Sequence, residues 1–129
     1  MAMKMHDPNA ERINLRVEAV GAGAPVTEIV YTVPAEKVFY LEECDLSPWA
    51  FAAGFCAMFI RNVLDVTVRG LASIMIATEA GAVTSDHAVF ESFLELAEGF
   101  DICVYTDANN LDAMGTISGF LCDAPADYE

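Results

Sequence analysis

The stretch FLELAEGFDICVY, residues 93–105, decides the fold class together with Asn109–Asn110 and the segment GTISGFL at residues 115–121. Its apolar segments have the length of strands, and Gly99 and the two asparagines separate them where polar turns form. Glycine provides the positive φ that a turn at Ala97–Phe100 requires. We therefore predict three strands joined by two turns, which are the closing part of an antiparallel β-sandwich.

The segments before this region also have strand patterns. Residues 13–19 alternate apolar and polar side chains, as a strand with one face on a core does. Residues 26–33 are rich in β-branched and aromatic side chains. Only Pro34–Lys37 separates them from residues 38–44, and a connection this short cannot support a parallel crossover. We therefore expect these two segments to pair as an antiparallel hairpin.

Two further strands are expected at residues 63–69 and 71–78, which alternate weakly or form a continuous apolar run. The segment that follows, residues 79–87, is small, polar and contains glycine. Such a composition predicts a protruding loop.

Residues 47–61 have two structural interpretations. Ser47 and Pro48 resemble an N-cap and a first helical residue, and alanines follow them. Gly54 and several aromatic side chains oppose a long helix. We favour a short helix at residues 47–53 followed by a strand from about residue 54 to residue 61. A single helix from residue 48 to residue 61 is the alternative and would make the fold α+β.

These patterns predict an all-β protein, an antiparallel and jelly-roll-like β-sandwich of about eight strands with at most one short helix at residues 47–53. A chain of 129 residues is long enough for one core. We expect the sandwich to span residues 12–123. Residues 1–11 lack periodicity and are predicted to form a flexible N-terminal arm, and residues 124–129 form an acidic C-terminal tail.

The chain is strongly acidic, because 20 Asp and Glu residues oppose 6 Lys and Arg residues, for a net charge of -14. The basic residues are scattered, whereas nucleic-acid binding needs them clustered, so we expect no nucleic-acid partner. An acidic surface is consistent with solubility, with a basic protein partner or with a saline environment. The longest apolar run, Trp49–Ile60, is too short to cross a bilayer, and residues 1–11 lack the apolar stretch of an export signal. We expect no membrane contact and synthesis in the cytoplasm.

No sequence motif supports catalysis. His6 and His87 are the only histidines, which is too few for a histidine-based metal site, and no serine lies in a Gly-x-Ser-x-Gly elbow. Phosphate-binding loops are absent, and Asp101, Asp107 and Asp112 lack the regular spacing of a calcium loop. We therefore expect no enzyme activity, no metal and no cofactor. Apolar neighbours predict that all four cysteines are buried free thiols: Cys44, Cys56, Cys103 and Cys122.

Three segments resemble a known group of proteins. They are VYTVPAEKVFYL at residues 30–41, LELAEGFDICV at residues 94–104 and GTISGFL at residues 115–121. Their turn and strand patterns, within residues 26–122, are similar to those of small jelly-roll modules from virions of tailed bacteriophages, which occur as capsid decoration (cement) proteins and as fibre heads. The resemblance implies a virion structural protein that binds the outside of the assembled head. It also implies the major capsid protein as partner and a homo-oligomeric state, with a trimer as one form.

A protein of this kind acts through its surface. The candidate interface consists of six residues: Met3, Met5, His6, Trp49, Phe51 and His87. The first three lie in the arm, which we expect to become ordered on a neighbouring subunit. The two aromatic residues fit either an exposed contact or an anchor in the core, and we favour the core. Two alternative functions are a receptor- or carbohydrate-binding module of a phage fibre and an acidic inhibitor or adaptor that binds a basic partner.

Overall fold

The computed structural model describes residues 10–50, 53–76 and 85–124. Within these ranges the chain forms eight β-strands, and the all-β prediction is confirmed. No helix that could span a membrane occurs in this part of the chain. The strands are β1 (Glu11–Ala19), β2 (Val26–Thr32), β3 (Lys37–Ala50), β4 (Gly54–Arg61), β5 (Thr67–Ile76), β6 (Asp86–Leu96), β7 (Asp101–Thr106) and β8 (Leu111–Asp123).

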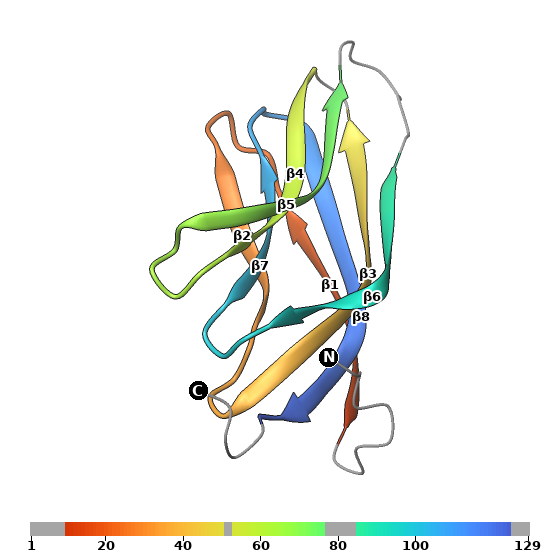
Figure 1. Ribbon diagram of the computed structural model, residues 1–129. Helices are drawn as coiled ribbons and strands as arrows, with labels where there is room; N and C mark the ends of the chain where they lie inside the picture. The colour runs from red at the N-terminus through yellow and green to blue at the C-terminus, as the bar shows by residue number, and fades with distance from the viewer. Residues whose placement is uncertain (1–9, 51–52, 77–84, 125–129) are drawn as a thin grey trace.

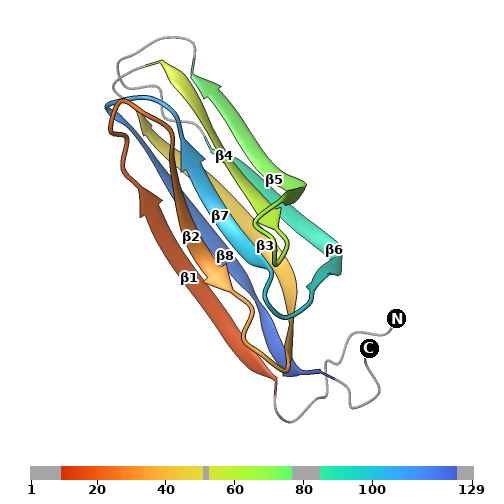
Figure 2. The ribbon, with the colours of Figure 1, turned by 90° about the vertical axis from the view of Figure 1, so that its left-hand side faces the viewer.

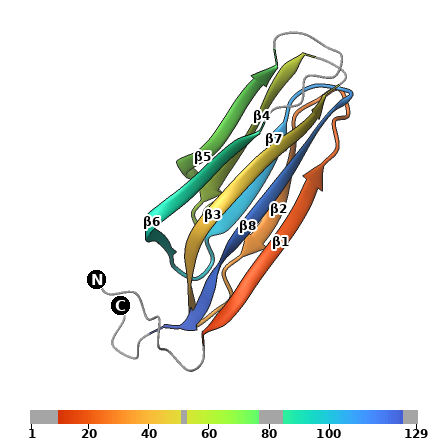
Figure 3. The ribbon, with the colours of Figure 1, turned by 90° about the vertical axis from the view of Figure 1, so that its right-hand side faces the viewer.

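Two four-stranded antiparallel sheets face each other. The first has the order β1-β8-β3-β6 and is called the β8 sheet, and the second has the order β2-β7-β4-β5 and is called the β7 sheet. The β7 sheet is nearer the viewer in Figure 2, and the β8 sheet is nearer in Figure 3. Only β4 and β5 are consecutive strands within one sheet, and every other connection between described strands crosses to the opposite sheet (Figure 1). Eight strands connected in this way form a jelly roll.

The core lies between the two sheets. Along β8, Ala113, Ile117 and Leu121 are buried in it, whereas Thr116 and Phe120 lie on the outer face and are only partly covered. This is the period of two expected of a strand with one face on a core. Each large side chain that is fully buried contributes about 1.5–3 kcal/mol to stability. Both sheets supply such side chains: Phe39, Leu41, Leu46, Met58, Leu96, Ile102, Leu111 and Ile117.

The short helix predicted at residues 47–53 is wrong, and so is the alternative helix from residue 48 to residue 61. β3 continues as a strand through Ser47 and Pro48 to its end, and it pairs with β8 along this whole length. The Ser47 hydroxyl donates a hydrogen bond to Asp45 Oδ2 at 2.7 Å and does not cap a helix. Long-range pairing thus outweighs the local helix-start signal. The strand predicted from residue 54 to residue 61 is confirmed as β4.

The predicted hairpin of the second and third strands is also wrong, because β2 and β3 lie in opposite sheets. The buried residue Val33 keeps the end of β2 on the β7 sheet. Its N–H donates to Phe100 O at 3.0 Å, and its carbonyl oxygen accepts a hydrogen bond from Gly99 N–H at 2.9 Å. The chain then crosses to the β8 sheet in a turn where Glu36 has a φ of 66°. A short connection therefore links two facing sheets here.

In place of the two strands predicted at residues 63–69 and 71–78, the structure has a single strand, β5, over Thr67–Ile76, and residues 77–78 lie outside the described residues. Residues 62–66 form the turn of a β4–β5 hairpin instead. The pairing of β5 with β4 shifts in register twice. Such bulges interrupt the alternation of apolar and polar residues, so the period of two does not run unbroken through β5.

The loop predicted at residues 79–87 ends earlier than expected, because Asp86 and His87 already belong to β6. Residues 79–84 lie outside the described residues. The predicted arm and tail lie mostly outside them as well. The last residue assigned to the arm, Glu11, is the first residue of β1.

Substitution of Gly119 tests the close approach of β8 to β3. A Cβ atom at this position would lie 2.3 Å from Tyr40 O and 2.7 Å from Phe39 Cζ, so the strands would have to shift. We expect Gly119→Ala to lower the free energy of unfolding by about 2 kcal/mol. Urea denaturation followed by circular dichroism measures this change.

Gly70→Ala is the matched control for that experiment. A Cβ atom at Gly70 meets nothing within 4 Å. We expect this variant to change the free energy of unfolding by less than about 0.5 kcal/mol. An equal loss of unfolding free energy in Gly119→Ala and Gly70→Ala would contradict the close approach of β8 to β3.

Candidate functional site

The structure describes two of the six candidate interface residues. Trp49 is 63% exposed near the end of β3, so the favoured interpretation of this residue as a core anchor is wrong. His87 lies on a strand and not in a loop, and it pairs with Asp45 of β3. Both belong to the β8 sheet but lie at different positions along it. The other four lie outside the described residues: Met3, Met5, His6 and Phe51.

His87 belongs to a polar cluster on the outer face of the β8 sheet. A bulge in β3 lies next to Glu43, and the strand then presents Glu43 and Asp45 beside His87. The Nε2 atom of His87 lies 3.0 Å from Glu43 Oε1, and its Nδ1 atom lies 3.4 Å from Asp45 Oδ1. The cluster borders a shallow hollow of about 310 Å³, which Arg12 and Ser118 also line.

Arg12 of β1, beside this cluster, contacts side chains of β3 and β8. Arg12 Nη2 lies 2.8 Å from Glu42 Oε1 and donates a hydrogen bond to Ser118 Oγ at 2.7 Å. Partly exposed ion pairs of this kind contribute at most about 1 kcal/mol each. Among the described residues, no group of three or more His, Cys, Asp or Glu side chains is placed to hold a metal ion. What the cluster offers is a set of donors and acceptors on a sheet face, suited to contact with a polar surface.

The aspartates considered as calcium ligands take part in structural contacts. Asp107 Oδ1 accepts a hydrogen bond from Phe55 N–H at 2.8 Å. Asp112 Oδ1 accepts one from Gly21 N–H at 2.9 Å. Asp101 pairs with an arginine of β4, as described below. Each of these carboxylates joins two separate segments of the chain.

The β4–β5 hairpin carries an exposed apolar tip, which sequence reasoning did not identify. Leu64 is 77% exposed and Val63 is 63% exposed, and both lie in the turn. Val66 and Val68 continue the apolar surface into β5, and both are exposed. Figure 1 shows this turn projecting sideways from the sandwich. A cluster of exposed apolar side chains of this kind is typical of an interaction surface.

Hydrogen bonds to Asn62 hold the tip in one conformation. Its Oδ1 atom accepts hydrogen bonds from Leu64 N–H at 2.9 Å and from Val66 N–H at 3.1 Å. Its backbone donates to Val66 O at 2.9 Å, and Asp65, with a φ of 60°, donates its N–H to Asn62 O. Asparagine and aspartate suit these positions, because their short polar side chains stabilise turns and tolerate a positive φ. The exposed tip is therefore ordered by its own side chains.

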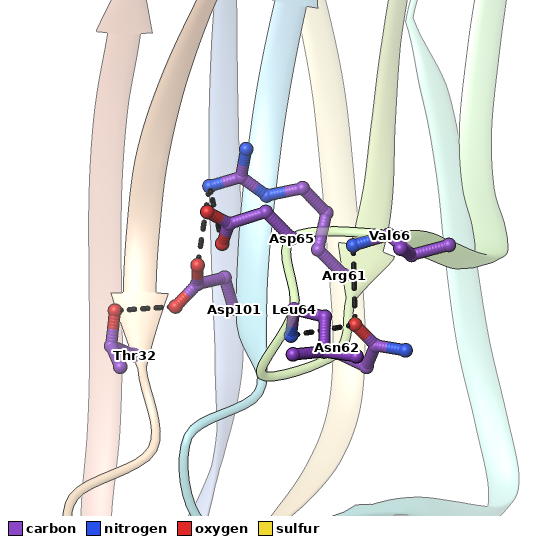
Figure 4. A network of polar contacts seen from close by, with 7 residues as sticks. All are labelled: Thr32, Arg61, Asn62, Leu64, Asp65, Val66 and Asp101. Carbon is purple, nitrogen blue, oxygen red and sulfur yellow. Dashed lines mark hydrogen bonds and ion pairs between the residues drawn. The ribbon is translucent and has the colours of Figure 1, made fainter.

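An ionic network ties the base of the hairpin to the rest of the β7 sheet (Figure 4). Arg61 Nη2 lies 3.2 Å from Asp101 Oδ2 and 3.8 Å from Asp65 Oδ1. The other oxygen of Asp101 accepts a hydrogen bond from the Thr32 hydroxyl at 2.6 Å. Asp101 is only 6% exposed. The network therefore links β4 to β7 and β2 through a buried carboxylate whose two oxygens both have partners.

Gly99 permits the hairpin tip to pack beside the turn between β6 and β7. This glycine has a φ of 83°, as the sequence predicts for the turn at Ala97–Phe100. A Cβ atom on Gly99 would lie 2.5 Å from Val63 Cγ1. Glycine at this position thus satisfies two requirements, a positive φ and a close approach of the hairpin.

The apolar tip continues into the outer face of the β7 sheet. Phe55, Ala57 and Phe59 alternate with buried residues along β4 and are partly covered. The rings of Phe55 and Tyr105 pack with centroids 6.2 Å apart. Phe55, Ala57 and Phe59 border a hollow of about 430 Å³ at Gly70, where the absence of a side chain leaves open space, and Asp86 of β6 borders it as well.

A signal for this surface is present in the sequence. Residues 54–76 contain two arginines and one aspartate, although the whole chain has a net charge of -14. The hairpin itself therefore carries a single acidic side chain, and Asp86 of β6, whose Oδ2 atom accepts a hydrogen bond from Ser73 N–H at 3.0 Å, borders its hollow.

All four cysteines are buried and free, as predicted. Burial raises the pKa of the Cys44 thiol to about 11, and the negative charges of Asp86 and Asp45 add to this effect. Burial and the charge of Asp107 raise the pKa of Cys56 to about 11 as well. Both thiols are therefore protonated near neutral pH, where they act as small apolar side chains.

Comparisons with known proteins identify the fold. No protein-family model matches the sequence, and no curated protein sequence matches it. A chain of the cyanophage Pam1 capsid asymmetric unit has a TM-score of 0.51 at 12% identity, over 97% of this chain and 91% of that chain. The coat protein of Tobacco streak virus has a TM-score of 0.47 at 12% identity, over 94% of this chain and 93% of that chain.

One further similar structure comes from a protein outside virions. The nucleoplasmin-like N-terminal domain of Drosophila FKBP39 has a TM-score of 0.43 at 15% identity, over 92% of this chain and 95% of that chain. At 12% identity, the similarity to the Pam1 capsid chain establishes the fold and nothing more.

Matched substitutions test the network at the base of the hairpin. Asp101→Asn removes a buried charge that faces Arg61, and we expect it to lower the free energy of unfolding by about 2 kcal/mol. Asp65→Asn removes the exposed partner of the same arginine, which lies 3.8 Å away. We expect that variant to change stability by less than about 0.5 kcal/mol. Urea denaturation compares the two, and an equal effect of both changes would refute the central role of Asp101.

The raised thiol pKa values predict a loss of stability at alkaline pH. In the folded protein Cys44 and Cys56 keep their protons up to about pH 11, whereas the thiols of an unfolded chain ionise near 9. The folded state thus binds more protons between these pH values, so the free energy of unfolding falls as the pH rises through this window. We expect a flatter pH dependence in the variant Cys44→Ala/Cys56→Ala. Urea denaturation across this range measures it, and identical slopes would exclude the two thiols as the cause.

Proposed function

We propose that the chain is a virion structural protein, namely a capsid decoration protein that binds the outside of an assembled head. The observation that carries this proposal is the jelly-roll strand order, which superposes on a chain of the cyanophage Pam1 capsid over 97% of the present chain. The features of the surface support it, since the described residues present an ordered apolar hairpin and a polar sheet face. Surfaces of these two kinds act by contact with other proteins.

Decoration stabilises a shell by mass action. A protein that binds the assembled shell and not the free subunits shifts the equilibrium towards assembly. Each copy contributes a modest contact, and the many copies on one head add up through multivalency. The major capsid protein is the partner in this proposal. The protein would be made in the host cytoplasm and would reside on the capsid surface.

The N-terminal arm is proposed as a strap that lies over a neighbouring subunit. The described chain enters β1 at Glu11, and β1 is an edge strand of the β8 sheet. An arm that starts at such an edge can reach a neighbour without disturbing the core. The strap would become ordered on binding.

Particles purified from the source material test the decoration role. We expect antibodies against the chain, carrying gold, to label the outside of intact heads in electron micrographs. Labelling of fibres would favour receptor binding instead, and particles that carry no label would contradict a virion role.

Shells stripped of the protein test the strap. Added wild-type protein should bind them and raise their melting temperature, whereas a chain without residues 1–9 should bind more weakly. This deletion leaves β1 intact. A chain without residues 125–129 is the matched control at the other end. Equal binding by all three chains would exclude the arm as a strap.

A further inference from the structure

We propose that the β4–β5 hairpin and the adjoining outer face of the β7 sheet dock a second copy of this chain. The inference goes beyond the decoration role, because it concerns the isolated protein. Its basis is a coincidence of three features in one region: an ordered apolar tip, a hollow, and a hairpin in which Asp65 is the one acidic residue.

Electrostatics restrict where two copies can meet. Each chain has a net charge of -14, so the approach of two copies is opposed by long-range repulsion. The repulsion is smallest where acidic residues are fewest, and residues 54–76 contain only Asp65 against Arg61 and Arg69. Asp86 of β6 also borders the hollow, where its carboxylate accepts a hydrogen bond from Ser73 N–H. A basic partner, by contrast, would be attracted to the acidic surfaces elsewhere. The local charge therefore favours a second acidic copy at this face.

Shape supplies the second step. Val63 and Leu64 protrude from the tip, and the hollow of about 430 Å³ at Gly70 lies beside Phe55 and Phe59 on the same hairpin. Because each copy carries both features, a two-fold axis would seat each tip in the hollow of the other copy. A head-to-tail arrangement of the same contact would close into a ring, and a trimer is one such ring.

Order supplies the third step. The hydrogen bonds of Asn62 and the pairing of Arg61 with Asp101 fix the tip before any partner binds. A contact between preformed surfaces loses little conformational entropy on association. The apolar tip is therefore suited to a specific contact.

Sedimentation velocity of the purified full chain tests the proposal. We expect a dimer or a trimer at about 100 μM and dissociation on dilution, as an association with a Kd of about 1–10 μM gives. We also expect association to strengthen as sodium chloride is raised, because salt screens the repulsion between acidic chains. A chain that stays monomeric throughout, or an oligomer that salt dissociates, would overturn the proposal.

Three variants with the same charge change locate the contact. Leu64→Glu alters the tip, and Gly70→Glu places a charged side chain in the hollow, where a Cβ atom meets nothing within 4 Å. Val89→Glu is the matched control, since Val89 is 61% exposed on β6 of the other sheet. We expect the first two to weaken association by at least about tenfold and the control to leave it nearly unchanged.

Urea denaturation of each variant checks that the fold is intact. The proposal is overturned if Val89→Glu weakens association as much as Leu64→Glu does. A failure of self-association is distinct from a failure of the decoration role, because binding to stripped shells is measured separately.

Discussion

The pairing of β3 with β8 is the contact on which the rest of this structure depends. The two strands are paired from Lys37 to Ala50, although the 60 residues from 51 to 110 lie between them in the sequence. β1 pairs with the other edge of β8, and β6 pairs with the other edge of β3, so the whole β8 sheet is assembled around this pair. The strands of the β7 sheet are placed opposite the β8 sheet, because each connection except the one between β4 and β5 crosses from one sheet to the other. Gly119 allows the two central strands to approach closely.

The same pairing explains which predictions from the sequence are right. Alternation and turn residues are local, so the all-β class, the strand at residues 54–61 and the turn at Gly99 follow from the sequence. Helix-start residues at Ser47 and Pro48 are local as well, but the partner that overrides them, β8, is distant in sequence. Whether two successive strands pair with each other or face each other is likewise decided by distant partners, which is why the hairpin of β2 and β3 was wrong.

The proposed interaction surface was harder to predict than the fold. Of the six candidate interface residues, Trp49 and His87 lie in the described part of the chain, both on the β8 sheet. The apolar hairpin lies on the other sheet. Its residues are of types that form strands, and their side chains are exposed to solvent. Exposure is a property of the folded chain and cannot be read from the residue types. Val66 and Val68 have the same residue type as core positions. In the sequence, only the local depletion of acidic residues distinguishes this region. That depletion can be interpreted as a property of a surface only when the structure shows that the hairpin projects from the sandwich.

Hydrogen–deuterium exchange of the intact chain at low and at high protein concentration tests most directly that this jelly roll acts through the β4–β5 hairpin. We predict that amides of β3 and β8 are the most protected at both concentrations, because their exchange requires global unfolding. Protection of residues 62–70 should increase at high concentration, where copies of the chain meet. Unchanged exchange in the hairpin, with new protection confined to the strands that carry Glu43, Asp45 and His87, would contradict the claim that the protein acts through the hairpin.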